Sequence, residues 1–335
     1  MSIYVHKPGL LSTVQDGGRT GYQQYGVIVS GAMDHFAHQA ANLLVGNTGD
    51  EATLEMTVIG PVLEFERAAV IAVCGADLSP SIGGKAVPLW RPVYIPAGAV
   101  LRFGSSRQGC RGYLAAAGGL NVPHQMNSRS TYLRAGIGGY QGRSLQAEDR
   151  LPVQQPTELG ELIAGGIQAR MEEGEPFGTV GWSVSYEMLP DYGKHPVIRI
   201  LPGAQQSWFE EESLKDLHSA EFIVQPQSDR MGYRLAGKPL HKVKQQELLS
   251  EPVTFGTVQV PPDGNPIVLM ADRQTTGGYP KVAQVITADL PLLAQSQIGS
   301  SIRFQPVTLQ EAQEIQLMAS LNLRFLRKSI RMYFV

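Results

Sequence analysis

"LEMTVIGPVLEF", residues 54–65, aligns with "SEPVTFGTVQVP", residues 250–261, when the chain is shifted by 196 positions. The shift places Glu55 on Glu251. The same shift pairs Gly60 with Gly256, Val62 with Val258, and Ile71 and Val73 with Ile267 and Leu269. At slightly different shifts, "KPG" (7–9) matches "LPG" (201–203) before these and "GAVLRF" (98–103) matches "GSSIRF" (299–304) after them. Because the matches keep one order along the chain, they predict two related β-barrels, one within residues 1–104 and one within residues 197–305.

The composition also favours a mainly β fold with a few short helices. The 335 residues include 37 glycines and 22 prolines without a repeat period, and only 17% are charged, as expected for short strands joined by tight turns. Apolar, β-branched runs predict strands: 62–66, 68–76, 93–104, 111–119, 195–203, 253–260 and 266–271. Closing such strands into barrels removes exposed sheet edges.

The chain is too long for one ordinary core, so we expect two domains. The first covers residues 1–196, with 105–196 as extra strands and a connector, and the second covers 197–305. Residues 306–335 form a C-terminal helix and a basic tail, which either docks a partner or packs on the second barrel. A further helix is expected from Met33 to Val45, with Asp34 at its N-cap or in its first turn and Gly46 after its end.

Charge and cysteine content limit the classes of partner. With 28 Lys and Arg against 30 Asp and Glu, the net charge of −2 favours neither nucleic acid nor an anionic membrane, so small molecules or proteins are expected. Cys74 and Cys110 lack CxxC spacing, which favours reduced, buried thiols in a cytoplasmic protein. No signal peptide or membrane span is expected. His35 and His38 have no third ligand at a metal spacing, so no metal site is predicted.

Candidate binding residues gather in "DRQTTGGYP" (272–280), which follows the apolar strand "PIVLMA". The glycines turn the chain, but they also let a ligand approach the backbone. Polar side chains and backbone amides suited to a small anion come from Gln274, Thr275, Thr276, Gly277 and Gly278. Asp272 is a candidate catalytic carboxylate at the same strand end.

Two further loops carry charged candidates. "TVQDGGRTGYQQYGV" (13–27) contains Asp16 and Arg19, which either form an ion pair or leave the guanidinium free to bind a carboxylate or phosphate. A similar pattern in "DRMGYRL" (229–235) contributes Arg230. Glu251 is either a general base or an acceptor for local backbone amides.

One glycine-rich stretch has the composition of a phosphate-binding loop. "GIGGYQG" (136–142) offers backbone amides that suit an anion, and arginines lie near it in the sequence. The chain contains no GxxxxGK[ST] motif, however, and no GxSxG elbow. Neither a P-loop nor a serine hydrolase site is therefore predicted.

"GLLSTVQDGGRTGYQQYGVIVSGAMD" (9–34), "SDRMGYRL" (228–235) and "SEPVTFGTVQVPPDGNPIVLMADRQTTGGYPKVAQV" (250–285) resemble the biotin-dependent carboxyltransferase A/B family, also called allophanate hydrolase subunit 2 or urea amidolyase-like. The resemblance extends over residues 3–305 in unbroken order. It implies a fold of two cyclophilin-like β-barrels, in agreement with the repeat.

Among the members of this family, the resemblance is strongest to stand-alone bacterial chains of an ATP-dependent 5-oxoprolinase, and it implies opening of 5-oxoproline to L-glutamate. Such a reaction needs cations or amides for phosphate, a guanidinium for the substrate carboxylate and a carboxylate for protons. For the first two tasks, position favours Arg19, Arg230, Gln274, Thr275, Thr276, Gly277 and Gly278. For the third it favours Asp16, Glu251 and Asp272.

Cofactor and partner expectations follow from the same resemblance. No nucleotide-binding motif is visible, so ATP is expected to be handled with companion subunits, including a protein of the kinase-inhibitor family, and the chain alone should be inactive. A biotin-carrier motif is also missing from the sequence, and biotin is not expected. Two alternatives remain open: a carboxyltransferase-type subunit acting on urea or a related amide, and a non-catalytic antagonist that binds a sporulation kinase inhibitor.

Overall fold

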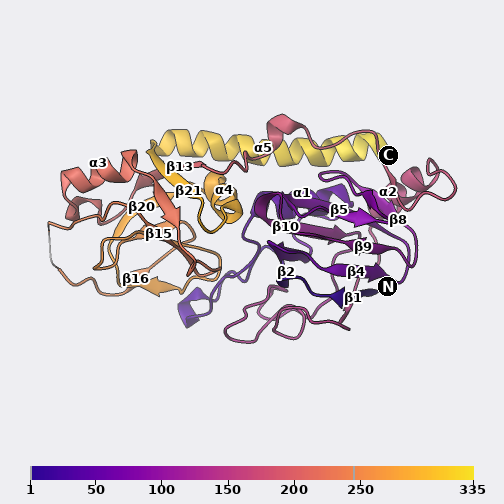
Figure 1. Cartoon of the computed structure of the whole chain (residues 1–335), viewed down its shortest axis with the longest axis horizontal. Helices are drawn as coiled ribbons and strands as arrows, with labels where there is room; N and C mark the ends of the chain where they lie inside the picture. Colours follow the sequence, from indigo (N-terminus) through magenta and orange to yellow (C-terminus); the bar gives the residue numbers. More distant parts are fainter. Residues whose placement is uncertain (1, 244–245) are drawn as a thin grey trace. The chain divides into compact units, whose positions relative to one another are not determined.

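The computed structural model describes residues 2–243 and 246–335 and divides the chain into two compact units (Figure 1). Unit 1 comprises the chain up to Arg19, Asp34–Leu189 and Ser320–Val335, and unit 2 comprises Thr20–Met33 and Pro190–Ala319. Each unit has its own cluster of buried apolar side chains. Thr20–Met33 therefore belongs to unit 2, although the residues before and after it in the chain belong to unit 1. Met33 packs in the core of unit 2.

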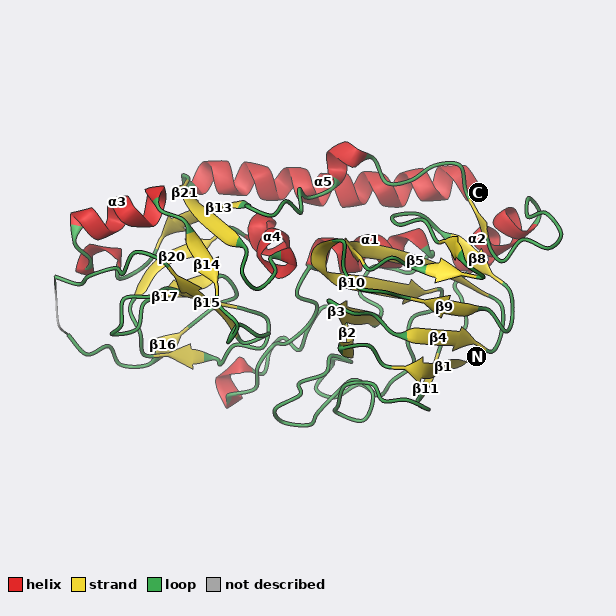
Figure 2. Ribbon diagram, viewed as in Figure 1, coloured by secondary structure: helices red, strands yellow, loops and turns green. Residues whose placement is uncertain are grey.

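In unit 1 the described residues form two six-stranded sheets (Figure 2). The first has the order β11 (Arg150–Pro152), β1 (Ser2–Lys7), β4 (Val62–Phe65), β9 (Val100–Arg102), β6 (Ser81–Ile82), β7 (Lys85–Ala86). The second has the order β12 (Gly178–Thr179), β8 (Val93–Ile95), β5 (Ala69–Asp77), β10 (Gln108–Ala116), β3 (Thr53–Thr57), β2 (Leu11–Gln15). Every pairing within them is antiparallel.

The core of unit 1 takes alternate residues from strands of both sheets, such as Leu63 and Phe65 of β4 and Leu54 and Met56 of β3. The expected mainly β fold with few helices is confirmed. The strands of unit 1, however, form two separate hydrogen-bonded sheets around this core. The predicted closed barrel would instead have joined them in one continuous ring of paired strands. Irregular register in β1 and β10 bends these strands.

In unit 2, seven strands of the described chain close into a barrel. Their order is β13 (Val197–Pro202), β20 (Lys281–Val285), β17 (Thr257–Gln259), β18 (Ile267–Leu269), β15 (Gly232–Ala236), β14 (Phe222–Val224), β21 (Ser301–Pro306). The ring closes where β21 pairs with β13 in parallel, and its other pairings are antiparallel. A short ribbon, β16 (Glu251–Pro252) with β19 (Thr276–Gly277), forms a separate pair.

The strands that the 196-residue shift aligns have different neighbours in the two units. β4 pairs with β1 and β9, whereas β17, its counterpart by sequence, pairs with β20 and β18. The repeat therefore located β strands correctly but did not predict how they pair. Pairing depends on contacts between distant parts of the chain, which a linear shift does not contain.

Helices cover parts of both units, with bounds α1 His35–Leu44, α2 Glu158–Gln168, α3 Glu211–Ser219, α4 Leu290–Gln295 and α5 Leu309–Phe334. Single 3₁₀ turns occupy Gln23–Tyr25, Tyr186–Met188, Gln206–Trp208 and Thr287–Asp289. The expected helix from 33 to 45 is confirmed as α1, and Asp34 is its N-cap, where a carboxylate oxygen accepts a hydrogen bond from the backbone N–H of Ala37 at 2.9 Å. None of the helices in the described ranges combines the length and apolar character that crossing a membrane requires.

The end of α5 removes one of the two alternatives for the C-terminal segment, packing on the second barrel. Residues 320–335 belong to unit 1, not to the second barrel, and in Figure 1 the C-terminus lies beside α2. Phe334 packs closely on Gly166 of α2, where a Cβ would come within 3.2 Å of its ring. The ring of Trp182 meets that of Phe334 edge-on, with centroids 6.3 Å apart. These contacts hold the end of α5 to unit 1.

Candidate functional site

Asp16 follows β2 in unit 1 and is buried. Its carboxylate accepts hydrogen bonds from the Ser128 hydroxyl at 2.7 Å, the Ser130 hydroxyl, and the backbone N–H groups of Arg129 and Gly18. Burial raises the pKa of Asp16, but the hydrogen bonds outweigh burial and hold the pKa below its ordinary value. Asp16 is therefore an ionised anchor for the loop that contains Ser128 and Ser130, and its catalytic role stays a prediction.

Arg19 anchors the same loop and is completely buried. Its Nε donates to the carbonyl of Gln125 at 3.0 Å, and its Nη2 donates to the carbonyl of Ser130 at 2.7 Å. "GIGGYQG" packs against this arrangement, since a Cβ on Gly138 would lie 2.0 Å from the Ser130 carbonyl oxygen and 2.6 Å from Arg19 Nη2. Close packing thus explains the glycine at 138 without a bound phosphate.

Gly138→Ala is expected to lower the free energy of unfolding by about 1–3 kcal/mol more than Gly136→Ala, because its methyl group overlaps the Ser130 carbonyl. The two glycines make a matched pair: both have a positive φ, of +70° and +64°, but Gly136 has open space around its Cβ position. Urea unfolding followed by circular dichroism measures the difference. Equal losses in the two variants would show that the contact with Ser130 is unimportant.

A buried polar cluster on β3 and β10 was not predicted from the sequence. Glu55 and Tyr113 are paired across the strands, and the Tyr113 hydroxyl donates to Glu55 at 2.8 Å and accepts from the backbone N–H of Asp34 at 2.8 Å. Burial and the nearby charge of Glu55 raise the pKa of Tyr113 well above its ordinary value, so the hydroxyl stays protonated. Arg111 Nε lies 3.8 Å from Glu55. In residues 53–57 polar side chains alternate with core side chains, and this alternation usually indicates that the polar side of a strand faces solvent. Here the polar side is buried as well, so the sequence pattern gave no sign of the cluster.

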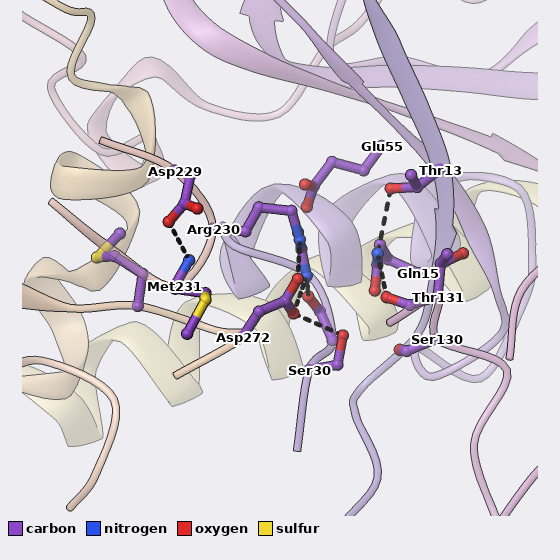
Figure 3. Close-up of polar contacts among 12 residues, drawn as sticks. Thr13, Gln15, Ser30, Glu55, Ser130, Thr131, Asp229, Arg230, Met231 and Asp272 are labelled. Carbon is purple, nitrogen blue, oxygen red and sulfur yellow. Dashed lines mark hydrogen bonds and ion pairs between the residues drawn. The ribbon is translucent and has the colours of Figure 1, made fainter. Parts of the chain in front are cut away.

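Two neighbours extend this cluster in unit 1. His38 is fully buried, with Nδ1 2.9 Å from the Thr53 hydroxyl, and burial lowers its pKa to about 4, so the ring is neutral at pH 7. Figure 3 shows Gln15 with its amide directed at Thr13 and Thr131; Nε2 donates to the hydroxyl of Thr13 at 3.1 Å and the carbonyl of Thr131 at 3.2 Å. Gln15 Oε1 is buried without a hydrogen-bond partner in the part of the chain that the structure describes.

In unit 2, two predicted site residues 42 positions apart form a buried ion pair (Figure 3). Arg230 donates through Nε and Nη2 to the two carboxylate oxygens of Asp272, each at 2.9 Å, and Nη2 also donates to the carbonyl of Gly31 at 2.6 Å. The Ser30 hydroxyl donates to Asp272 at 2.7 Å. Asp229 turns the backbone ahead of β15 by accepting from the N–H of Met231 at 2.8 Å, which places Arg230. Bidentate geometry makes this a strong, oriented pair.

Glu251 is the most exposed of the three predicted carboxylates and lies on the β16–β19 ribbon of unit 2. It pairs directly with Gly277, so the structure joins two more predicted residues. Lys281 Nζ lies 2.6 Å from its carboxylate and Gln205 Nε2 lies at 3.3 Å. The hydrogen bond from Lys281 holds the pKa of Glu251 below its ordinary value. An ionised, solvent-accessible carboxylate of this kind can act as a base.

The remaining predicted residues follow Asp272 along the chain. Gln274, Thr276 and Gly278 are exposed, whereas Thr275 is half-buried and its carbonyl accepts from the N–H of Val253 at 3.1 Å. At Gly277 a Cβ would lie 2.5 Å from Nε2 of Gln259, a residue that the sequence did not single out. A side chain at 277 would displace the end of Gln259, and the binding roles of this segment stay predictions.

Arg273 is a second residue that the sequence analysis missed, although it stands within "DRQTTGGYP". Its guanidinium lies 5.9 Å from the ring centroid of Phe255 and donates to the carbonyl of Met270 at 3.3 Å. Burial lowers the pKa of Arg273 to about 10, although the negative charge of Asp272 acts to raise it. The guanidinium is therefore still charged at pH 7. No carboxylate in the described ranges forms an ion pair with Arg273, which makes it a better candidate for an anionic ligand than Arg230.

Metal binding finds no support in the described residues, which contain no group of three or more His, Cys, Asp or Glu side chains that could hold a metal ion. Cys74 and Cys110 are both buried and free, and burial raises the pKa of Cys74 well above its ordinary value. The Cys74 thiol therefore lacks the character of a nucleophile.

Comparison with known proteins places these residues in context. A family model described as carboxyltransferase domain, subdomain A and B, matches residues 25–306. The chain is 38% identical over 319 residues to a 5-oxoprolinase subunit of Haemophilus influenzae, covering 95% of this chain and 96% of that protein, and 39% identical over 312 residues to the corresponding 5-oxoprolinase subunit of Escherichia coli, covering 92% and 93%. The solved urea amidolyase of K. lactis is similar with a TM-score of 0.87 and 27% identity, over 97% of this chain and 20% of that one.

Proposed function

This chain belongs to the carboxyltransferase A/B domain family, and on that premise we propose that it is one subunit of an ATP-dependent 5-oxoprolinase that opens 5-oxoproline to L-glutamate. The observation that carries the proposal is the match along almost the whole length of both chains with proteins named as 5-oxoprolinase subunits. The urea amidolyase similarity covers only a fifth of a much longer chain.

The chemistry of the substrate sets what the site must do. A lactam is a poor electrophile, and transfer of a phosphoryl group from ATP to its carbonyl oxygen makes the carbonyl carbon reactive. One water then opens the ring by breaking the C–N bond, and a second water hydrolyses the resulting acyl phosphate. The reaction needs a base for water, a cation for the anionic substrate and donors for the developing charge.

Unit 2 offers groups for these tasks. Glu251 supplies an ionised carboxylate held by Lys281, and Arg273 supplies a charged guanidinium. Exposed polar groups of Gln274 and Thr276 follow it in the chain. In this proposal the chain binds and orients 5-oxoproline, and ATP is handled with companion subunits. In the phosphate-loop-like stretch, Gly138 packs on Arg19 and Ser130, and Gly139 packs on Thr131.

The test is reconstitution. Mixing this chain with its purified companion subunits, 5-oxoproline and ATP is expected to release glutamate together with ADP and phosphate, and leaving this chain out is expected to abolish release. Enzyme-coupled detection of glutamate measures both reactions. Full activity without this chain would refute the proposal.

A second candidate is a carboxyltransferase-type subunit that acts on urea or a related amide, which the similarity to urea amidolyase favours. The activity of such a subunit depends on a biotinylated carrier protein. Turnover of urea that avidin inhibits would support it, whereas glutamate release that is insensitive to avidin supports the 5-oxoprolinase assignment.

A further inference from the structure

The part of α5 that belongs to unit 1, residues 320–334, has two apolar faces. Leu326 and Ile330 are buried against unit 1. Phe325 is 60% exposed and Met332 is 86% exposed, and the seven residues between their positions correspond to two helical turns, or about 10 Å along the axis. A large apolar side chain exposed alone is ordinary, but these two lie in line on one side of the helix and form an apolar stripe, with Lys328 and Ser329 between them along the chain.

A groove runs beside this stripe. It has a volume of about 430 Å³ and lies between residues 182–188 and α5, with Trp182, Met188, Phe325, Leu326, Ile330 and Tyr333 among its lining. Its wall is firmly held: Trp182 meets Tyr333 edge-on with centroids 5.5 Å apart, and Arg170 Nη1 donates to the Tyr333 hydroxyl at 2.9 Å. The groove is therefore a formed apolar surface of unit 1.

Positive charge flanks the stripe. Arg324, Arg327, Lys328 and Arg331 fall within eight residues and are all exposed, whereas residues 315–335 contain no Asp or Glu. None of the four forms an ion pair with another residue in the described ranges. Because the whole chain has a net charge of only −2, this local excess is a distinct feature of the surface.

We propose that this groove, together with Phe325 and Met332, is the docking surface for an acidic amphipathic helix of a companion subunit. The inference rests on the proposed function in that the chain acts within a complex. A helix with apolar residues every seven positions fits both the stripe and the groove, and acidic residues along its edges match the four cations. A second copy of this chain is the less favourable occupant, since two copies of this surface would set like charges against each other.

The experiment measures binding of the full chain to its purified companion subunits by biolayer interferometry, without turnover. Phe325→Glu with Met332→Glu is expected to weaken binding about tenfold or more. Arg324→Glu with Lys328→Glu is expected to weaken it at low salt and to reduce its dependence on salt. Matched controls are Leu10→Glu and Arg107→Glu, exposed positions of unit 1 far from α5 in sequence, which are expected to bind like the unmodified chain. Unchanged melting temperatures check that every variant folds.

Other outcomes overturn the inference. The inference is refuted if the α5 variants bind as tightly as the unmodified chain. It is also refuted if the unmodified chain binds no companion subunit at micromolar concentration. Self-association that the α5 variants lose would assign the surface to a second copy, and binding to phosphatidylglycerol vesicles in place of the subunits would assign it to a membrane. A complex that forms through this surface but releases no glutamate refutes the proposed function and leaves the docking surface intact.

Discussion

Asp272→Asn is expected to lower the free energy of unfolding of unit 2 by about 3–5 kcal/mol, since it leaves the buried guanidinium of Arg230 without its countercharge. Both side chains are almost completely buried, and Figure 3 shows the Asp272 carboxylate held between Arg230 and Ser30. The amide that replaces it can keep one acceptor but not the charge. Guanidinium chloride unfolding followed by fluorescence measures the loss.

Two control variants separate the charge effect from packing. Asp77→Asn changes a carboxylate at the end of β5 in unit 1 that is half-buried and accepts from the backbone N–H of Ser79 at 2.8 Å, so a much smaller loss is expected. Replacing both partners, Arg230→Met with Asp272→Leu, is expected to recover much of the stability because no charge remains buried. If Asp272→Asn cost no more than Asp77→Asn, the pair would be unimportant for folding.

Glu251→Gln is expected to reduce kcat for glutamate release at least about a hundredfold, because an amide cannot accept a proton from the attacking water. Glu251 is partly exposed, so folding and assembly of the complex should remain intact. Coupled glutamate assays on the assembled enzyme measure kcat, and size-exclusion chromatography checks assembly. Wild-type kcat in this variant would remove Glu251 from the mechanism, and a loss of assembly together with kcat would favour a role in binding the companion subunits.

The dependence on pH provides a second readout for Glu251. Lys281 holds the pKa of Glu251 below its ordinary value, and a base works only above its own pKa. Lys281→Met is therefore expected to raise the pKa of Glu251 and move the acidic limb of the activity profile to higher pH. Glu311→Gln, which changes an exposed carboxylate on α5, is the matched control and should leave the profile unchanged.

Some site contacts could be anticipated from the sequence, and others could not. The sequence predicts Asp272 and Gly277 as site residues because they follow a buried strand, and the structure pairs each with another predicted residue, Asp272 with Arg230 and Gly277 with Glu251. The sequence leaves Arg19 either paired with Asp16 or free to bind an anion, yet its guanidinium donates to carbonyl groups more than a hundred residues away along the chain. A loop sequence shows that a charge is present but not which distant groups neutralise it.

The sequence by itself determined the mainly β character, the position of α1 with its Asp34 cap and the family. These depend on side-chain alternation, capping and motif order, which act over a few residues at a time. Only the tertiary structure decided that unit 1 forms two sheets, that Arg230 is paired, and which of the two apolar faces at the end of α5 is buried. Each of these depends on contacts between residues far apart in the chain, and such contacts exist only after the chain has folded.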